Sequence, residues 1–308
     1  MLQSKTPRPL LPTIQAYADL IRFNKPAGTV FVFIPFAYSL AVSAHATKMP
    51  FIEVLRCLSL FAFWAFLARS LACTVNDICD RDIDGQVART KKRPLPSGRV
   101  TLVGATTFLV GQIMSFVAVF YHVNPAVYRE SLIWLVLIMV YPWMKRVTNY
   151  PQAWLGIAIN WGAVIGWTYI NENINFPVLG SLMLGLFAWT MFYDTMYAVQ
   201  DLEDDTKIGI GSSAVATSRV LHTFLYIWAI TFAVFMTMVG VINHHGPIFF
   251  ALSVSAPFAS LVNQVRCLVL HDPSTYQDNF ARNSRVSLLI LGGIFADCLV
   301  GKTSSSVF

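Results

Sequence analysis

Charged residues are scarce in this sequence. Of its 308 residues only 12% are Asp, Glu, Lys or Arg, whereas 56% are hydrophobic, and the mean hydropathy is +0.57. In soluble globular domains about a quarter of the residues are charged. The length would suit two soluble domains, but this deficit of charge excludes them and indicates an integral membrane protein.

Cysteine and histidine are also few and scattered. The five cysteines have neither metal-type nor redox-type pair spacing, and His244 and His245 are the one adjacent pair among six histidines. No short apolar core precedes a small-residue cleavage site, so no cleavable signal is predicted. We therefore favour packing roles for the cysteines and histidines.

Basic arms with interleaved polar residues are absent too. The sequence therefore predicts no nucleic-acid partner, and it implies no obligate protein partner.

Long apolar runs make up most of the chain. A run of about 20 apolar residues is the unit that crosses a bilayer. The runs are continuously apolar, which excludes a transmembrane β-barrel, whose strands alternate. We predict an all-α integral membrane protein with about nine transmembrane helices. The predicted spans are 27–46, 54–76, 101–121, 127–144, 153–170, 177–199, 220–242, 247–270 and 286–302.

These spans define the predicted domain organisation. Residues 26–303 form a single nine-helix domain in the lipid bilayer, followed by a short tail at 304–308. Residues 1–25 precede the first span, and within them residues 10–23 have the apolar spacing of a helix that lies along the membrane surface.

The basic residues predict the orientation of the chain. Nine spans place the N-terminus and the loops after the second, fourth, sixth and eighth spans on one side, together with most Lys and Arg residues. By the positive-inside rule this side faces the cytoplasm. The exceptions are Lys48, Arg56, Arg129 and Lys302 on the other side and Arg69 inside a span. Most acidic residues gather on the same side as the basic ones, which topology alone does not require.

Four aspartates within eight residues close the second span, in the segment NDICDRDID. Asp77, Asp80 and Asp84 are spaced as i, i+3 and i+7, so they share one face of a helix. Asn76 stands beside the first of them, whereas Asp82 points off this face. A row of bare carboxylates at the end of a membrane helix predicts a bound cation, because the charges repel one another near hydrocarbon.

A second acidic segment, DTMYAVQDLEDDTKIGIG, closes the sixth span. Asp194, Asp201 and Asp205 are spaced by seven and four residues, again one helical face. Mg²⁺ prefers oxygen ligands and takes one or two carboxylates together with substrate phosphate. We therefore predict that the two acidic helix ends face each other and hold Mg²⁺ with a diphosphate.

Basic residues on the same side complete this predicted site. Cations around a diphosphate stabilise the charge that builds on a leaving group. The residues predicted to bind the diphosphate are Arg93, Lys145, Arg146 and Lys207. Ordinary loop charges would explain one such cluster, but not two spaced carboxylate sets beside it. A cation transporter would need acids near mid-membrane, and a scaffold protein would need none of this spacing.

Together these segments resemble the UbiA superfamily of membrane prenyltransferases, and most of all its 4-hydroxybenzoate polyprenyltransferase branch. NDICDRDID is similar to the family motif NDxxDxxxD, and DLEDD is similar to DxxxD. The segments RTKKRPLPSG and YPWMKRVTNYPQ follow in the family order, although Gly211 stands where the hydroxybenzoate enzymes usually place a lysine. The resemblance implies nine helices around a central chamber, two Mg²⁺ ions, a prenyl diphosphate and an aromatic acceptor. It implies catalytic and metal-binding roles for Asn76, Asp77, Asp80, Asp84, Asp201 and Asp205.

Four polar residues within the spans are predicted to contact an acceptor or line the chamber. An arginine in a membrane span needs an anion. For Arg69 this anion is either Asp194, in an internal salt bridge, or a substrate carboxylate or phosphate oxygen. Asn160 is a candidate polar contact, and Tyr141 offers an aromatic face to a carbocation.

The resemblance also gives an expected reaction, the Mg²⁺-dependent transfer of an isoprenyl group, farnesyl, to a ring carbon of a phenolic acid. Mitochondrial ubiquinone enzymes carry a longer extension than the roughly 25 residues before the first span. This favours a relative of the fungal meroterpenoid enzymes of secondary metabolism, in the endoplasmic reticulum membrane. The alternatives are the 4-hydroxybenzoate polyprenyltransferase of ubiquinone biosynthesis and the haem, chlorophyll or menaquinone prenyltransferases.

Overall fold

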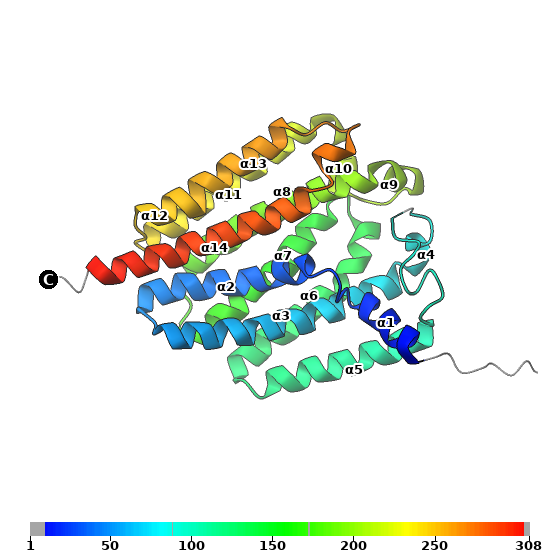
Figure 1. Cartoon of the computed structure of the whole chain (residues 1–308), viewed down its shortest axis with the longest axis horizontal. Helices are drawn as coiled ribbons and strands as arrows, with labels where there is room; N and C mark the ends of the chain where they lie inside the picture. The colour runs from blue at the N-terminus through cyan, green and yellow to red at the C-terminus, as the bar shows by residue number, and fades with distance from the viewer. Residues whose placement is uncertain (1–9, 88, 172, 305–308) are drawn as a thin grey trace, which may run out of the picture.

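The computed structural model describes residues 10–87, 89–171 and 173–304, so the predicted tail at 304–308 lies almost entirely outside the described residues. Within the described ranges the chain is helical, and nine helices are long and apolar enough to cross a membrane. They run side by side as one bundle (Figure 1). In chain order these spans are α2 (Ala27–Thr47), α3 (Phe51–Cys79), α5 (Leu102–Tyr121), α6 (Pro125–Val147), α7 (Pro151–Ile170), α8 (Phe176–Ala198), α11 (Leu221–Ile242), α12 (Pro247–Phe249) continued by α13 (Ala256–Arg266), and α14 (Asn279–Ser304).

The prediction of nine helical spans is confirmed, and the boundaries differ at the polar ends. The second span was predicted to end at 76, but α3 continues to Cys79. The last was predicted to begin at 286, but α14 begins at Asn279. Hydropathy marks only the apolar part of a helix, whereas polar turns extend it beyond the bilayer core. A π-helical turn, Phe250–Ser255, also interrupts the eighth span.

Local sequence signals explain where several helices begin. Asn124 and Asn175 accept hydrogen bonds from the backbone N–H groups of Val127 and Val178, and a proline follows at the first helical positions. These are favourable N-cap and N1 residues. The caps therefore define tight connections at one end of the bundle.

Helix α2 lies inside the bundle, and most of its span is buried. Phe36 of α2 packs against Trp64 of α3 and Trp134 of α6, all three fully buried. On the α7 side, a Cβ atom at Gly162 would lie 2.6 Å from the ring of Phe36. The glycine thus allows the close approach of α7 to α2, which positions the walls of the site described below.

The N-terminal segment forms α1 (Leu10–Leu20) at one end of the bundle. Ala16 and Leu20 are buried against Leu95 and Val100, whereas the Ile14 side chain is 63% exposed. The predicted helix is present, and its contact with the membrane surface stays a prediction.

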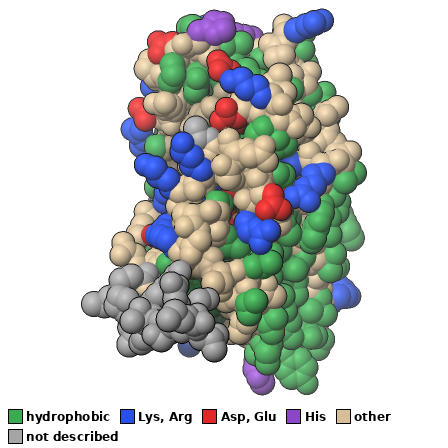
Figure 2. Space-filling view, turned by 90° about the vertical axis from the view of Figure 1, so that its right-hand side faces the viewer, with side chains coloured by type: hydrophobic (Ala, Val, Ile, Leu, Met, Phe, Trp, Pro, Cys, Tyr) green, Lys and Arg blue, Asp and Glu red, His purple; other side chains and the backbone are tan. Residues whose placement is uncertain are grey.

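This end of the bundle also carries the charged side chains. It comprises α1 and the connections 80–101, 148–150, 199–220 and 267–278, and we call it the charged face. Figure 2 shows Lys, Arg, Asp and Glu side chains together on this face, beside a flank of hydrophobic side chains. The charge pattern of the sequence therefore corresponds to one end of the folded chain.

Site-directed labelling tests this topology. In a background with all cysteines replaced by alanine, Lys91→Cys and Asn173→Cys place single thiols at two exposed positions. We expect a membrane-impermeant maleimide to label them from opposite sides of a sealed vesicle, and Lys91→Cys from the cytoplasmic side. Labelling of both from the same side would contradict the nine-span arrangement.

Candidate active site

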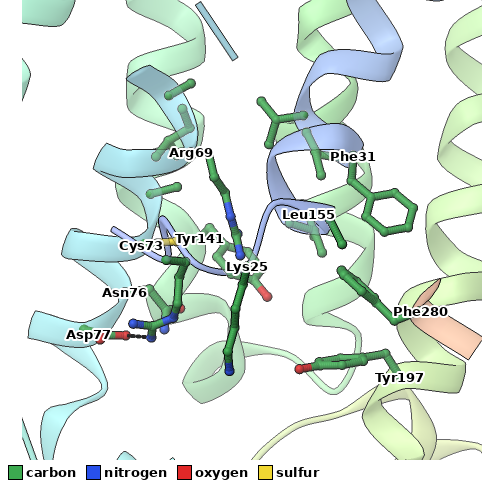
Figure 3. A pocket seen from close by; sticks show the side chains of 18 of the residues that line it. Lys25, Phe31, Arg69, Cys73, Asn76, Asp77, Tyr141, Leu155, Tyr197 and Phe280 are labelled. Atoms are coloured by element: carbon green, nitrogen blue, oxygen red, sulfur yellow. Dashed lines mark hydrogen bonds and ion pairs between the residues drawn. The ribbon is translucent and has the colours of Figure 1, made fainter. Parts of the chain in front are cut away.

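A cavity of about 860 Å³ opens at the charged face and extends between the helices (Figure 3). Its deep walls come from α2, α3, α6, α7 and α8 and are largely apolar. The apolar residues of these walls include Phe31, Val32, Trp134, Ile138, Leu155 and Ile159. Its mouth is lined by charged residues, so the cavity offers a polar opening above an apolar interior.

The first acidic motif lies at this mouth. Asp77 lies in the last turn of α3, Asp80 is the cap residue between α3 and α4, and Asp84 belongs to the short helix α4 (Arg81–Asp84). All three are at most 4% exposed, as expected if they share one inward face. Arg93 Nη1 lies 2.6 Å from Asp84 Oδ2 and 3.4 Å from Asp77 Oδ1. Burial raises the pKa of Asp84, and the neighbouring Arg93 opposes this shift.

Two carboxylate oxygens of this motif have no hydrogen-bond partner among the described residues. Arg22 Nη2 lies 2.6 Å from Asp77 Oδ1, and Lys145 Nζ lies 3.2 Å from Asp80 Oδ2. The other oxygens, Asp77 Oδ2 and Asp80 Oδ1, are buried without a hydrogen bond. Buried oxygen atoms of this kind are rare in proteins, and they are suited to coordinate a cation. The donor set, hard carboxylate oxygens, fits Mg²⁺.

The second acidic motif does not continue as one straight helix. Helix α8 ends at Ala198, a 3₁₀ turn spans Val199–Asp201, and α9 (Leu202–Ile208) carries Asp205. Asp201 forms a two-pronged ion pair with Arg89, whose Nη2 and Nε lie 2.6 and 3.0 Å from its carboxylate oxygens. Arg89 also donates to the Tyr197 hydroxyl at 2.9 Å. The ion pair between Arg89 and Asp201 therefore joins the connection 80–101 to the second acidic motif.

Arg22 and Arg89 are two charged site residues that the sequence analysis missed. Arg22 follows α1 and has a left-handed backbone with φ of 60°, a conformation uncommon outside glycine. Its partner Asp77 lies 55 residues away in the sequence, so no local spacing indicates the contact. Arg89 is the first residue of the segment RTKKRPLPSG, which resembles a segment of the family. This resemblance is the sequence feature that could have indicated a role for Arg89 in the site.

Arg69 reaches from α3 into the cavity, above Asn76 and Asp77 in Figure 3. A Cβ atom at Gly28 would lie 2.6 Å from the guanidinium, so the glycine leaves space for it. The Nε atom is buried without a hydrogen-bond partner. No carboxylate of the described residues lies within 4.0 Å of this guanidinium. The described residues thus form no Arg69–Asp194 salt bridge, both side chains line the same cavity, and the role of Arg69 stays a prediction.

Tyr141 and Asp194 line the same cavity, as predicted, but Asn160 does not. Asn160 Nδ2 donates to Gly156 O at 2.7 Å and to Thr190 Oγ1 at 3.0 Å, between α7 and α8. The prediction of a chamber contact was wrong for Asn160. The position of a residue in a span indicates its depth in the membrane. It does not indicate whether the residue faces the cavity or a neighbouring helix.

Two predicted diphosphate ligands also lie outside the cavity lining. Lys207 is exposed and pairs with Glu203 at 3.8 Å. Arg146 Nη2 donates to the backbone oxygen of Cys79 at 2.7 Å. In contrast, Arg93 and Lys145 line the mouth. Lys207 lies in α9, and its side chain is exposed to solvent.

Gly211 holds the connection after α9 against Lys145. Its N–H donates to Lys145 O at 3.0 Å, and a Cβ atom would clash with Thr148 O. We expect Gly211→Ala to displace Lys145 and to lower the rate of the prenyl transfer that the resemblance implies at least about tenfold, roughly 1.4 kcal/mol. The control is Gly180→Ala, because a Cβ atom there meets nothing within 4 Å. Equal rates for the two variants would contradict this role.

At the opposite face His245 lies with His45 and Asp297, where one ligand atom from each comes within 4.8 Å of the others. His245 Nδ1 lies 2.9 Å from Asp297 Oδ2, which also accepts from Gly246 N at 2.9 Å. Burial lowers the pKa of His245 to about 4, against the opposing hydrogen bond to Asp297. These contacts describe a packed polar network that fastens the start of α12 to α14.

A model of the UbiA prenyltransferase family matches residues 32–289. Among curated proteins, the chain is 33% identical over 287 residues to the mitochondrial 4-hydroxybenzoate polyprenyltransferase of Schizosaccharomyces pombe, covering 92% of this chain and 80% of that protein. It is 34% identical over 306 residues to the Drosophila melanogaster protein of the same name, covering 99% and 77%.

Solved structures show the same fold. A UbiA homolog from Aeropyrum pernix K1 superposes with a TM-score of 0.73 at 22% identity, covering 87% of this chain and 97% of that one. A UbiA homolog from Archaeoglobus fulgidus bound to GPP and Mg²⁺ superposes with a TM-score of 0.65 at 17% identity, covering 92% and 99%.

Proposed function

Because the chain belongs to the UbiA prenyltransferase family, we propose that it transfers a polyprenyl group from its diphosphate to a ring carbon of 4-hydroxybenzoate. One observation carries the choice of acceptor. The Arg69 guanidinium faces the cavity, below a mouth lined with acidic and basic residues, and no carboxylate of the described residues lies within 4.0 Å of it. A carboxylate on the acceptor would supply the missing anion.

This proposal replaces the expected farnesyl transfer in meroterpenoid biosynthesis. That expectation depended on the short segment before the first span, which carries little weight beside relatives of 33% and 34% identity named as mitochondrial 4-hydroxybenzoate polyprenyltransferases. The same relatives favour a mitochondrial membrane over the endoplasmic reticulum. The charged face would then be directed to the matrix.

Mg²⁺ is the proposed cofactor, as in the Archaeoglobus fulgidus homolog bound to GPP and Mg²⁺. Asp77 and Asp80 would hold it through their unpartnered oxygens, together with Asn76 and Asp84 from the first motif. Asp201 and Asp205 would hold it from the second. When bound, the metal would offset the negative charge of the diphosphate and of the departing pyrophosphate.

The basic side chains of the mouth exchange partners in this proposal. Arg22, Arg93 and Lys145 are paired with aspartates in the structure, and Arg89 is paired with Asp201. If the carboxylates coordinated a bound Mg²⁺, these cations would be free to donate hydrogen bonds to phosphate oxygens. They then stabilise the leaving group while the allylic C–O bond breaks.

The deep part of the cavity protects the resulting carbocation. Its walls include the aromatic rings of Phe31, Trp134, Tyr141 and Tyr193, whose faces stabilise cations. Apolar walls also exclude water, which would otherwise capture the cation. With the acceptor carboxylate on Arg69, the phenol ring forms the new C–C bond. Asp194 lines the same cavity, and in this proposal its carboxylate accepts the ring proton.

A transfer assay on the purified protein tests this function. The donors are farnesyl diphosphate and longer polyprenyl diphosphates, and the acceptors are 4-hydroxybenzoate, orsellinic acid and phenol. We expect transfer from the longer donors to 4-hydroxybenzoate, supported by Mg²⁺ and abolished by EDTA. Transfer to orsellinic acid but not to 4-hydroxybenzoate would refute the proposed acceptor, and transfer that is insensitive to EDTA would refute the metal.

A further inference from the structure

A second hollow lies on the charged face, between the end of α13 and the beginning of α14. It is a groove of about 650 Å³, and it shares no lining residue with the cavity of the active site. The short turn Pro273–Thr275 borders it. Its polar lining residues include Ser260, Asn263, Gln264, Thr275, Arg282 and Arg285.

One wall of the groove changes from basic to apolar along α14. Arg282, Arg285 and Leu289 are spaced by three and four residues, so they share one helical face. The two arginines lie within the first two turns of α14, at the charged face. Leu289 lies deeper and is 40% exposed, next to Leu288, which is 54% exposed. The groove therefore connects the charged face with the lipid-facing surface.

The two guanidinium groups lack anionic partners. Across residues 10–87, 89–171 and 173–304, no carboxylate lies within 4.0 Å of either group. The hydrogen bond of the Arg285 side chain is a long one, 3.5 Å from Nε to Ala281 O. Two adjacent arginines with free donors, facing one groove, form a site for a phosphate-bearing anion.

We propose that this groove binds the headgroup of an anionic phospholipid, with its phosphate between Arg282 and Arg285 and an acyl chain along Leu289. Basic pockets between transmembrane helices are suited to such headgroups. The hydroxyl and amide groups of Ser260 and Asn263 add hydrogen-bonding partners for a glycerol or a second phosphate. A free phosphate would use the arginines alone, whereas the apolar end of the groove suits an acyl chain.

Bound lipid would also stabilise the inner side of α14. Gln264 lines the groove, and its Oε1 accepts from Asn283 Nδ2 at 2.8 Å. Asn283 Oδ1 in turn accepts from Trp189 Nε1 at 3.1 Å. Trp189 packs against Phe31 and Tyr193, whose rings line the active-site cavity. A lipid bound in the groove would thus stabilise the packing of α13 and α14 against α8, which forms part of the cavity wall.

Native mass spectrometry and thermal denaturation of the full chain in neutral detergent test the proposal. The probes are phosphatidylglycerol, diphosphatidylglycerol, phosphatidylcholine and inorganic phosphate. We expect retained adducts and a raised Tm with the two anionic lipids only. The double variant Arg282→Gln/Arg285→Gln should lower their apparent affinity at least about tenfold, as expected when two charge-assisted contacts are lost.

The control is Arg266→Gln, since Arg266 is an exposed basic residue at the end of α13 that does not line the groove. Asn263→Trp, which fills the groove without changing charge, should weaken lipid binding like the double variant. Equal losses in Arg266→Gln would overturn the site in favour of general surface attraction. Competition by inorganic phosphate at the concentration of lipid, or equal binding of phosphatidylcholine, would overturn the assignment to an anionic lipid.

Discussion

Asp77→Ala, Asp80→Ala, Asp201→Ala and Asp205→Ala are each expected to lose nearly all prenyl transfer while the protein still accumulates in membranes. Each variant removes oxygen ligands from the proposed Mg²⁺ and diphosphate site, and charge stabilisation of this kind is usually the largest contribution to catalysis. The loss should exceed about tenfold, roughly 1.4 kcal/mol in activation free energy. The measurement is the initial transfer rate per amount of membrane-integrated protein.

Asp82→Asn is the matched control for these variants. Its side chain is 83% exposed and pairs with Arg81, away from the shared face of the first motif. It should keep most of the activity. If any two of the four alanine variants kept more than about a tenth of the wild-type rate, the account of a metal site built from two motifs would be wrong.

Arg69→Ala is expected to remove the preference for acceptors that carry a carboxylate. A charge-assisted hydrogen bond contributes about 1.5–3 kcal/mol, so discrimination between 4-hydroxybenzoate and its methyl ester should fall about tenfold to a hundredfold. The measurement is kcat/KM for both acceptors, in wild type and variant, at a saturating donor concentration.

Other roles for Arg69 give different results. If Arg69 contacts the diphosphate, kcat/KM should fall by the same factor for all acceptors, and the KM for the prenyl donor should rise. If it has a structural role with Asp194, Asp194→Asn should reproduce a loss of thermal stability. Equal losses for the acid and the ester with unchanged folding would rule out recognition of the acceptor carboxylate by Arg69.

The parts of the fold that depend on local sequence were predictable. Nine spans follow from apolar runs, because the bilayer sets their length. The shared face of Asp77, Asp80 and Asp84 follows from helical spacing, and the structure buries all three. A family resemblance in the two acidic motifs then indicated the reaction class.

The remaining features depend on contacts that local sequence does not encode. Arg22 and Arg89 meet Asp77 and Asp201 across 55 and 112 residues. A 3₁₀ turn separates α8 from the helix α9 that carries Lys207, whose side chain is exposed. Such contacts are set by how helices and loops pack, so they become visible only in the folded chain.

The most direct test of the central claim is the binding of Mn²⁺, as a spectroscopic substitute for Mg²⁺, in the presence of a non-reactive polyprenyl thiodiphosphate. Electron paramagnetic resonance of the purified protein reports the bound ion without requiring turnover. We predict tight Mn²⁺ binding only when the diphosphate analogue is present, and its loss in both Asp77→Ala and Asp201→Ala. Undiminished binding in either variant would contradict a metal and diphosphate site shared by the two acidic motifs.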